Sequence, residues 1–524
     1  MPISAMKFLS AVIAIGIFST APAATLVVTN TADAGVGSLR AAIVMANTAV
    51  DDDTIVFNIP STDPGFKAAT QHWRIDVVSA ALPAIANNLT IDGYTQPGAS
   101  PNTNTPDQGG SNATLKLELR NATGNAVNGL DGLSNSFNVM MVIRGLAIHS
   151  FASQIQLGGG MAQRVEGCFL GTTIDGAQDA NPANSNQIGV RVQGSGAFRI
   201  GALTPDTRNV ISGDSTGVAF QASADGIRIE GNLIGTNAAG TAAISPRAIG
   251  INFSASPNAR IGSSDAHARN IISGNGFYGL TASDTSATSK IQGNYFGTDW
   301  TGTRPIPNGL NPFSPSQTLE NVRLGSINCA LQLGGALSGE ANVIAFSPAS
   351  GLVIDTCTNA AHRNRFLGNA RIALDNVSGG GFGGATSNDA GDADTGGNRL
   401  QNFPVVTLPA GFLPAGGSSV DLSYLIDTLP ANATYPITVE FYRGACGGGS
   451  SGVLLGSDTY LASNAGATRG FTLVAADGGS VLPLVAVAVD AAANVSEFSP
   501  MLGDIIFRSD FEDVLGAATM GSCR

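Results

Sequence analysis

The feature that most constrains the fold is a phrase that occurs three times in the middle of the chain. Residues 165–172 (VEGCFLGT) reappear as residues 229–236 (IEGNLIGT) and again as residues 291–298 (IQGNYFGT). A second phrase keeps nearly the same period, since residues 208–213 (RNVISG) return as residues 269–274 (RNIISG). Two phrases with one period are typical of a chain whose similar units stack on one another.

The residues between these phrases show the alternation of short β-strands. Residues 217–220, 226–230 and 249–253 each alternate apolar with polar or small side chains, as a strand with one buried face does. Gly, Asn, Ser and Asp separate them and favour turns, and no helical period of apolar residues occurs in this region. We therefore predict a parallel β-helix, an all-β solenoid in which each recurrence forms three coils of roughly 20 residues.

The N-terminal residues 1–23 are typical of a secretory signal peptide. Lys7 precedes an apolar segment over residues 8–18, and residues 21–23 (APA) offer a small-x-small cleavage site. A buried N-terminal strand or helix is the alternative. No later run approaches the roughly 20 apolar residues of a membrane-spanning helix, so we expect a mature chain without a transmembrane segment. The predicted location is secreted, extracellular or on the outer cell surface.

Composition limits the classes of partner. Gly accounts for 67 of 524 residues and charged residues for only 12%, which suits a repetitive β-fold with tight corners. The formal net charge of −12 argues against nucleic acid and anionic lipid, because both select for Lys and Arg. The expected partner is an extracellular glycan or another cell-surface component.

Residues 24–58 are expected to form an N-terminal cap on the β-helix. Ser38 is placed to cap a short helix. The apolar face of that helix would consist of Leu39, Ala42, Ile43 and Ala46. A cap of this kind covers the first open sheet edge, which would otherwise recruit other chains.

The cap also carries a family resemblance. Residues 37–43 (GSLRAAI) resemble the Cys-Ser-Leu-Arg-Glu-Ala motif that opens many bacterial secreted β-helix proteins. Gly37 and Ala41 stand where that motif has Cys and Glu, so no role of those two residues is carried over. Together with the recurring phrases and residues 90–97, the likeness to right-handed parallel β-helix repeat proteins of bacterial surfaces covers residues 25–405. It implies a right-handed β-helix and no single activity.

The recurring phrases vanish after residue 404, which we predict to be the end of a β-helix that begins at residue 59. Strand-like runs at intervals of ten to thirty residues then indicate a small β-sandwich over residues 405–500. Within it, residues 493–499 are similar to the closing strand of Ig-like modules. Residues 501–524 form a tail that resembles the C-terminal tails of some exported proteobacterial proteins.

The strongest candidate site is an acidic, Gly-rich segment over residues 388–398. Asp389, Asp392, Asp394 and Asn398 can turn several oxygen atoms toward one centre, as Ca²⁺ requires. The bidentate Glu of an EF-hand is missing. The alternative is a solvated linker in which Asp and Gly serve turns, and no other cofactor is expected.

Two further features could contact a glycan. Glu166 and Glu230 share one repeat position with Gln292, so they could form a polar track along the β-helix, or they could be solvent-exposed alternate residues of strands. Trp300 could stack on a sugar ring, or it could cover the edge of the core.

The five cysteines lack the close spacing of a zinc site. Cys329 and Cys357 are separated by a little more than one predicted coil, so they could form a disulfide between neighbouring coils, or remain as two buried thiols. The four histidines share no short spacing, so we predict surface or corner positions for His72, His149 and the other two. No catalytic residue is assigned.

The predicted function is therefore non-catalytic: adhesion, glycan contact or a structural role outside the cell. The alternative is a polysaccharide lyase or glycoside hydrolase, because β-helices often carry such activities. The chain has no Gly-His-Gly and no Asp-Asp pair in its repeats, and Lys290 is the single Lys between residues 165 and 346. An adhesin should present a long face without a cleft, whereas an enzyme should have a groove in which three or more ionisable side chains converge.

Overall fold

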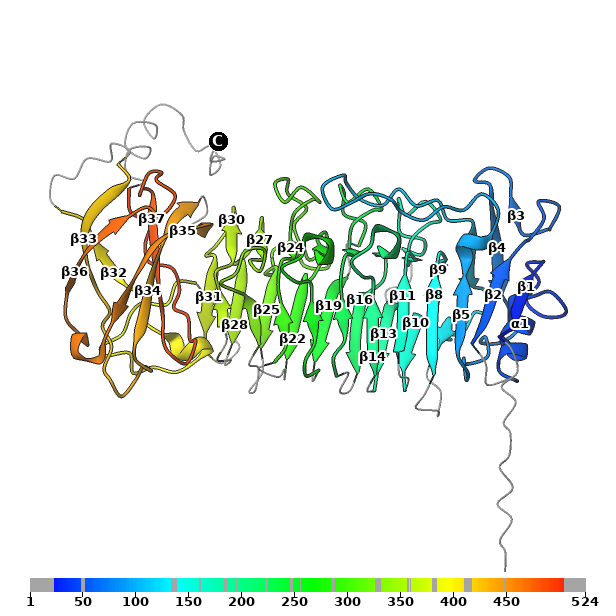
Figure 1. The fold of residues 1–524 in the computed structure, drawn as a ribbon, viewed down its shortest axis with the longest axis horizontal. Coiled ribbons are helices and arrows are strands. Elements are labelled where there is room, and N and C mark those ends of the chain that lie inside the picture. The colour runs from blue at the N-terminus through cyan, green and yellow to red at the C-terminus, as the bar shows by residue number, and fades with distance from the viewer. Residues whose placement is uncertain are drawn as a thin grey trace, which may run out of the picture.

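The structure is a computed structural model. It describes residues 23–48, 52–132, 139–159, 162–182, 186–194, 196–221, 225–245, 248–254, 256–283, 288–325, 331–355, 358, 360–378, 384–409, 417–445 and 449–503. Residues 1–22 of the predicted signal peptide and most of the predicted tail lie outside these ranges. In the described part the chain forms a rod of stacked β-strands with a small β-sandwich at its C-terminal end (Figure 1).

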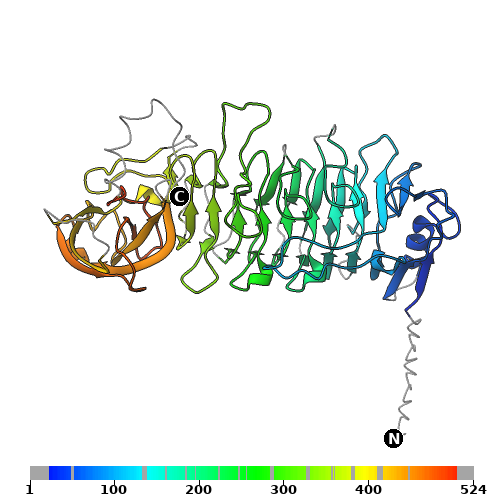
Figure 2. The same ribbon diagram turned by 90° about the horizontal axis from the view of Figure 1, so that it is seen from above.

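Three long sheets form the rod, which Figure 2 shows from above. Each complete coil adds one strand to every sheet. The first sheet contains β1 (Thr25–Val28), β2 (Asp53–Phe57), β5 (Leu89–Asp92), β8 (Met140–Arg144), β11 (Ala162–Glu166), β14 (Ala197–Ile200), β17 (Arg228–Ile229), β20 (Arg260–Ile261), β23 (Lys290–Ile291), β26 (Gln332–Gly334) and β29 (Ala360–His362). The second contains β7 (Leu130–Asp131), β10 (Ser153–Gly158), β13 (Ile188–Gln193), β16 (Thr216–Gln221), β19 (Ile249–Ser254), β22 (Leu280–Ser283), β25 (Val322–Gly325), β28 (Leu352–Asp355) and β31 (Leu374–Val377).

The third sheet contains β3 (Phe66–Lys67), β4 (His72–Val77), β6 (Leu117–Asn121), β9 (Ala147–His149), β12 (Phe169–Leu170), β15 (Val210–Ile211), β18 (Leu233–Ile234), β21 (Ile271–Ile272), β24 (Tyr295–Phe296), β27 (Val343–Ala345) and β30 (Arg365–Leu367). Its strands are parallel except for the antiparallel pair β3–β4. Short 3-10 turns connect elements at η1 (Gly93–Thr95), η2 (Pro205–Thr207), η3 (Ala266–Ala268), η4 (Gly397–Leu400) and η5 (Ala462–Asn464). The predicted parallel β-helix is thereby confirmed.

The recurring phrases stack in register, but the predicted number of coils is wrong. Arg199 pairs with Arg228 in the next coil, and Arg228 pairs with Arg260 in the coil after that. One recurrence therefore spans two coils, so each coil is half of the recurrence and not the third of it that we predicted. Each coil contains three strands and three corners, and the corners use more chain than the short strands do.

The corner between the first and third sheets is held by a ladder of buried asparagines. Each side-chain amide donates to the side-chain oxygen of the asparagine in the next coil, over 2.8–3.1 Å, through Asn209, Asn232, Asn270, Asn294, Asn342 and Asn364. The same amides donate to backbone carbonyls of the preceding coil. These asparagines are therefore part of the scaffold of the β-helix.

The N-terminal cap follows its sequence pattern. Helix α1 (Leu39–Ala46) begins after Ser38, whose hydroxyl accepts a hydrogen bond from the backbone N–H of Ala41 at 3.2 Å. Leu39, Ile43 and Ala46 are buried against the first strands, and Ala42 packs beside them. This face closes the apolar core of the rod at its first coil.

The loop between η1 and β6 lies along the outer face of the third sheet (Figure 1). The buried Arg208 guanidinium donates to the carbonyls of Gly109 and Gly110, and the backbone N–H of Ser111 donates to Ala238. A second apolar cluster fills the space between this loop and the sheet, and includes Leu115, Phe169, Leu233 and Ile271.

The C-terminal unit is a β-sandwich of two antiparallel sheets, as predicted. One contains β32 (Val405–Thr407), β33 (Ser419–Leu425) and β36 (Arg469–Val474), and the other contains β35 (Gly449–Tyr460), β34 (Ile437–Ala445) and β37 (Leu484–Val489). The segment expected as the closing strand, residues 493–499, runs along β37 with an isolated bridge between Val489 and Val495 and with hydrogen bonds from the Ser496 and Ser499 backbone N–H groups, but it forms no regular strand.

The sandwich packs directly on the last coils of the rod. Tyr442, Val485, Val487 and Val495 of the sandwich belong to the same apolar core as the β-helix interior. The buried Glu440 carboxylate pairs with His362 and Arg363 of the rod, each at 2.9 Å. No helix in the described residues is long and apolar enough to cross a membrane.

Candidate functional site

The predicted glycan-contact residues are dispersed and partly buried. Glu166 ends β11, and Glu230 directly follows β17, two coils further along the rod. Glu230 is only 4% exposed and lies 3.6 Å from the Arg228 guanidinium, so neither a surface track nor plain solvent exposure describes it. Gln292 is buried as well and donates to the carbonyl of Gly334. Glu166 is half-buried, and its burial raises its pKa.

Trp300 packs at the edge of an apolar cluster, which was the alternative to stacking on a sugar ring. Its ring belongs to the apolar cluster beneath the loop between η1 and β6, and it is half-buried there. The ring therefore covers an edge of packed side chains. The predicted disulfide concerns Cys329 and Cys357, which both lie outside the described residues. Cys168 is a buried free cysteine.

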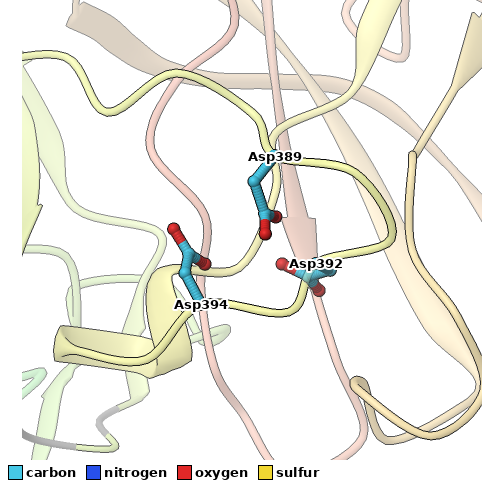
Figure 3. Close-up of side chains that lie close together, drawn as sticks. All are labelled: Asp389, Asp392 and Asp394. Atoms are coloured by element: carbon cyan, nitrogen blue, oxygen red, sulfur yellow. The ribbon is translucent and has the colours of Figure 1, made fainter.

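The structure brings the three predicted aspartates together. Asp389, Asp392 and Asp394 come from one loop between β31 and β32, and their carboxylates point toward a common centre (Figure 3). One oxygen of each lies within 4.8 Å of the others. Asn398, the fourth predicted ligand, donates its amide instead to Asn376 and to the Val495 carbonyl. The three aspartates, which we call the aspartate cluster, could hold a metal ion such as Ca²⁺.

The electrostatics of the aspartate cluster favour a cation. Burial raises the pKa of Asp392 to about 6, while hydrogen bonds from Asn402 and Thr428 oppose this rise and the neighbouring Asp389 and Asp394 add to it. Burial also raises the pKa of Asp394. The Asp394 Oδ1 atom is buried without a hydrogen-bond partner. No Lys or Arg of the described chain forms an ion pair with the three carboxylates.

A second group of ionisable residues was not predicted, and it includes two of the histidines. His72 and His149 are 5% and 4% exposed, so they are not surface residues, but both lie at strand ends, where corner positions were the other expectation. Both donate toward one carboxylate: His72 Nε2 lies 2.7 Å from Glu118 Oε2, and His149 Nε2 lies 2.8 Å from Glu118 Oε1. We call His72, Glu118 and His149 the triad. His267 is exposed, as predicted.

Three neighbouring strands of the third sheet position the triad. In β4 the inward residues Trp73, Ile75 and Val77 are buried in the core, so His72 and the alternate residues after it face outward. Arg74 of β4 is the register partner of Glu118 in β6. In turn Arg120 of β6 is the partner of His149 in β9. The stacking of parallel strands thus places six polar side chains in one patch: His72, Arg74, Asp76, Glu118, Arg120 and His149.

Glu118 is held in its ionised form. Burial alone would raise its pKa, but the hydrogen bonds from His149 and His72 outweigh burial and hold the pKa well below its ordinary value. A carboxylate only accepts hydrogen bonds, so each Nε2 atom must carry the proton it donates. A neutral His149 or His72 then has its free lone pair on Nδ1.

Glu118 and His149 of the triad form part of the wall of a polar cleft. This cleft, the triad cleft, has a volume of about 720 Å³ and lies where the third sheet turns toward the second. Four ionisable side chains line it, namely Arg74, Glu118, Arg120 and His149. Amide side chains complete much of the lining: Asn121, Asn125, Asn181, Asn186 and Gln187. Arg120 Nε lies 2.8 Å from Asp76 Oδ1, which fixes the guanidinium at one side.

Comparisons with known proteins do not assign a function to this chain. No protein-family model matches the chain, and no curated protein matches it. Among solved structures, the chain is similar to "Crystal structure of alginate lyase from Paenibacillus sp. str. FPU-7", with a TM-score of 0.29 and 12% sequence identity. That match covers 69% of this chain and 99% of the other. A likeness at this level carries no weight for function, which has to be argued from the sites themselves.

Proposed function

We propose that this protein is a carbohydrate-active enzyme that holds an extracellular polysaccharide in the triad cleft. The observation that carries this proposal is the convergence of Arg74, Glu118, Arg120 and His149 in one hollow. Proton transfer and nucleophilic attack both require several ionisable groups within reach of one bond. Adhesion along a flat face requires no such convergence, so the cleft favours the enzymatic alternative over the non-catalytic function predicted first.

The lining of the triad cleft suits a sugar chain. Its amide side chains offer both donors and acceptors to hydroxyl groups, and guanidinium groups can bind a carboxylate through two parallel hydrogen bonds. Its volume of about 720 Å³ is large enough for a few sugar residues. The lining contains two Arg side chains, one Glu and one His, so neutral and acidic glycans are both substrates to be tested.

A panel of neutral and acidic polysaccharides tests this proposal. We expect at least one to retard the purified protein in an affinity gel, and to yield unsaturated ends, reducing ends or a released substituent on incubation. Arg120→Met should weaken the retention about tenfold or more, because a charge-assisted hydrogen bond contributes roughly 1.5–3 kcal/mol. Arg164→Met is the matched control, since Arg164 is exposed on β11 of a different sheet. Retention that Arg120→Met leaves unchanged, with no product formed, would refute the cleft and favour adhesion.

We also propose that the aspartate cluster holds Ca²⁺. The proposal is supported by three carboxylates within 4.8 Å and by the buried Asp394 Oδ1 atom, which has no protein partner. Asp392 accepts a hydrogen bond from Thr428, which follows β33 of the sandwich, while the loop itself leaves the last coil of the rod. A bound ion would therefore stabilise the connection between the two parts.

Calcium should raise the melting temperature, and the increase should grow with the ratio of the calcium concentration to the dissociation constant. At a concentration ten times its dissociation constant it would contribute about 1.4 kcal/mol, and EGTA should remove this contribution. Asp394→Asn should abolish the calcium-dependent shift, whereas Asp421→Asn, at an exposed position of β33, should leave it intact. Because the pKa of Asp392 is about 6, the shift should shrink as the pH falls below 6. A melting temperature that is equal in calcium and EGTA rules out the site.

A further inference from the structure

The hydroxyl group of Ser150, at the wall of the triad cleft, extends the hydrogen-bond chain of the triad. Ser150 follows His149 directly, and its Oγ atom lies 2.8 Å from His149 Nδ1. His149 Nε2 lies 2.8 Å from Glu118 Oε1. From these contacts we infer that Ser150 is a nucleophile, activated by His149 and oriented through Glu118, which hydrolyses ester substituents. The identity of the ester as a substituent on a glycan rests on the proposed function, but the nucleophile itself does not.

The direction of proton transfer follows from the hydrogen-bond chain. Glu118 accepts from His149 Nε2–H, so the lone pair of neutral His149 is on Nδ1 and faces the Ser150 hydroxyl. The hydroxyl therefore donates to the imidazole, which is the arrangement of a nucleophile and its general base. Nucleophile, base and orienting carboxylate are recognised by this geometry and not by their order in the chain.

The backbone of Ser150, in the turn directly after β9, is compatible with this role. Its φ of +68° is in the left-handed region, which side-chain-bearing residues rarely adopt. Left-handed residues are common in the turns after strands of this sheet: φ is +77° at Gly171 and +94° at Gly235, and Phe346, directly after β27, has φ of +56°. The strained serine conformation costs of order 1–3 kcal/mol and persists where its surroundings fix it. Here Asn121 Nδ2 donates to the Ser150 carbonyl at 3.1 Å. A nucleophile on a sharp turn after a strand is exposed for attack in the same way.

The triad cleft also offers a positive charge to the reaction. Ser150 and His149 both line the cleft, and Ser150 is half-buried, so a substrate can reach its hydroxyl. Arg120 lines the same cleft and is the direct register partner of His149. A guanidinium at this place can stabilise the oxyanion that develops on the acyl group during attack.

The reaction balances without a further reactant except water. Ser150 Oγ attacks the acyl carbon of the ester while its proton moves to His149 Nδ1. The bond from the acyl carbon to the alcohol oxygen breaks, and His149 returns the proton to the departing alcohol. Water then attacks the acyl-Ser150 ester, giving one proton to His149, and the carboxylic acid leaves as Ser150 recovers its proton.

A second hydroxyl in the structure provides an internal control. Thr70 Oγ1 lies 2.7 Å from His72 Nδ1, so it forms the same kind of chain to the other oxygen of Glu118. Thr70 does not line the triad cleft, and its hydroxyl is on a branched carbon that hinders attack. Of these two hydroxyls, only that of Ser150 combines the hydrogen-bond chain with access from the cleft.

The experiment uses the full chain with a fluorophosphonate probe and with p-nitrophenyl acetate. We expect the probe to label Ser150, as located by mass spectrometry of the labelled peptide, and the ester to be hydrolysed. Ser150→Gly should abolish labelling and lower kcat/KM at least about 100-fold. Glycine adopts a positive φ without strain, so this variant removes the hydroxyl and keeps the backbone. Thr70→Ala should stay within about twofold of the native rate.

Each outcome decides the inference. Labelling and hydrolysis that Ser150→Gly removes and Thr70→Ala retains establish the nucleophile. Absence of labelling in the native chain, or equal rates in the native chain and Ser150→Gly, overturns it. Neither readout needs a polysaccharide. Hydrolysis of p-nitrophenyl acetate with no polysaccharide retained would therefore refute only the proposed glycan function. Retention of a polysaccharide without labelling of Ser150 would refute only the nucleophile.

Discussion

At the scale of single residues, the buried side-chain amide of Asn270 uses both its donor and its acceptor. Asn270 Nδ2 donates to the Ile229 carbonyl at 2.7 Å and to Asn294 Oδ1 at 2.8 Å. Its Oδ1 accepts from both the backbone N–H and the side-chain amide of Asn232, each at 3.0 Å. One side chain thereby satisfies buried polar groups in three successive coils. A β-helix needs this because its tight corners leave backbone groups that no strand partner reaches.

Asn270→Ala should therefore lower the free energy of unfolding, although Ala is smaller and fits the space. The substitution leaves the backbone N–H of Asn232 without its acceptor and removes one of the two donors to the Ile229 carbonyl, and an unsatisfied buried group costs roughly 1–3 kcal/mol. We expect a lower melting temperature and faster amide hydrogen exchange in the coils of β17 and β21. Asn58→Ala, at an exposed position, is the control and should change neither measurement. Equal effects of the two variants would show that the ladder adds no stability.

Residues close together in the sequence could be predicted as a site, and residues far apart could not. The aspartate cluster lies within one short segment, so its acidic spacing was visible directly. The triad combines residues that are 46 and 31 positions apart. In the sequence, His72, Arg74 and Asp76 alternate with apolar residues, but the strand that pairs with them depends on coil length. Coil length varies with the corners, and the sequence pattern does not determine it.

At the scale of elements, the same variation explains the error in coil number. The strands β16 and β19 belong to one sheet and lie one coil apart, with β17 on the first sheet between them in the chain. Period-2 alternation identified all three runs as strands, but it could not tell which sheet each joins. The two recurring phrases occupy neighbouring coils of the third sheet, where Val210 pairs with Leu233 and Leu233 with Ile271. Alternate coils are similar, and the repeat is consequently a pair of coils.

The expected closing strand of the sandwich illustrates how tertiary contacts override a local pattern. Residues 493–499 lie against the last coils of the rod, where the Asn376 side chain donates to the Val495 carbonyl. Phe498 packs edge-on against Phe366 of β30 and against Tyr442 of β34. The segment thus joins the two parts of the molecule. Along β37 it forms the isolated bridge of Val495 with Val489, and the backbone N–H groups of Ser496 and Ser499 donate to β37 carbonyls, without a regular ladder.

At the scale of the whole molecule, the junction between rod and sandwich contains two buried carboxylates, Glu440 and Glu497, whose pKa values are shifted in opposite directions. Glu440 is compensated by His362 and Arg363: burial raises its pKa, but these partners outweigh burial and lower it overall. Glu497 accepts hydrogen bonds from the backbone N–H groups of Asn376 and Thr386, at 3.0 and 2.9 Å, which carry no formal charge. Burial raises the pKa of Glu497 to about 7, and the nearby Asp375 adds to this rise.

The stability of the molecule should therefore fall as the pH rises from about 4.5 to 7. An unfolded chain releases the Glu497 proton near the ordinary pKa of 4.5, whereas the folded chain keeps it up to about pH 7. Within this window the unfolded state binds fewer protons, so the free energy of unfolding decreases with pH, by a total on the order of 3 kcal/mol. Glu440, with its lowered pKa, has the opposite sign and acts below the window, because its stabilisation is lost only as the pH falls under its ordinary value.

Calorimetry of the full chain in EGTA measures this pH dependence without a contribution from calcium. The melting temperature should be higher at pH 5 than at pH 8, because the folded chain keeps the Glu497 proton at the lower pH. Glu497→Gln cannot ionise, so whatever its absolute stability, the difference between the two pH values should shrink. An unchanged difference would place the pH dependence elsewhere and show that Glu497 does not couple proton uptake to the packing of the sandwich on the rod.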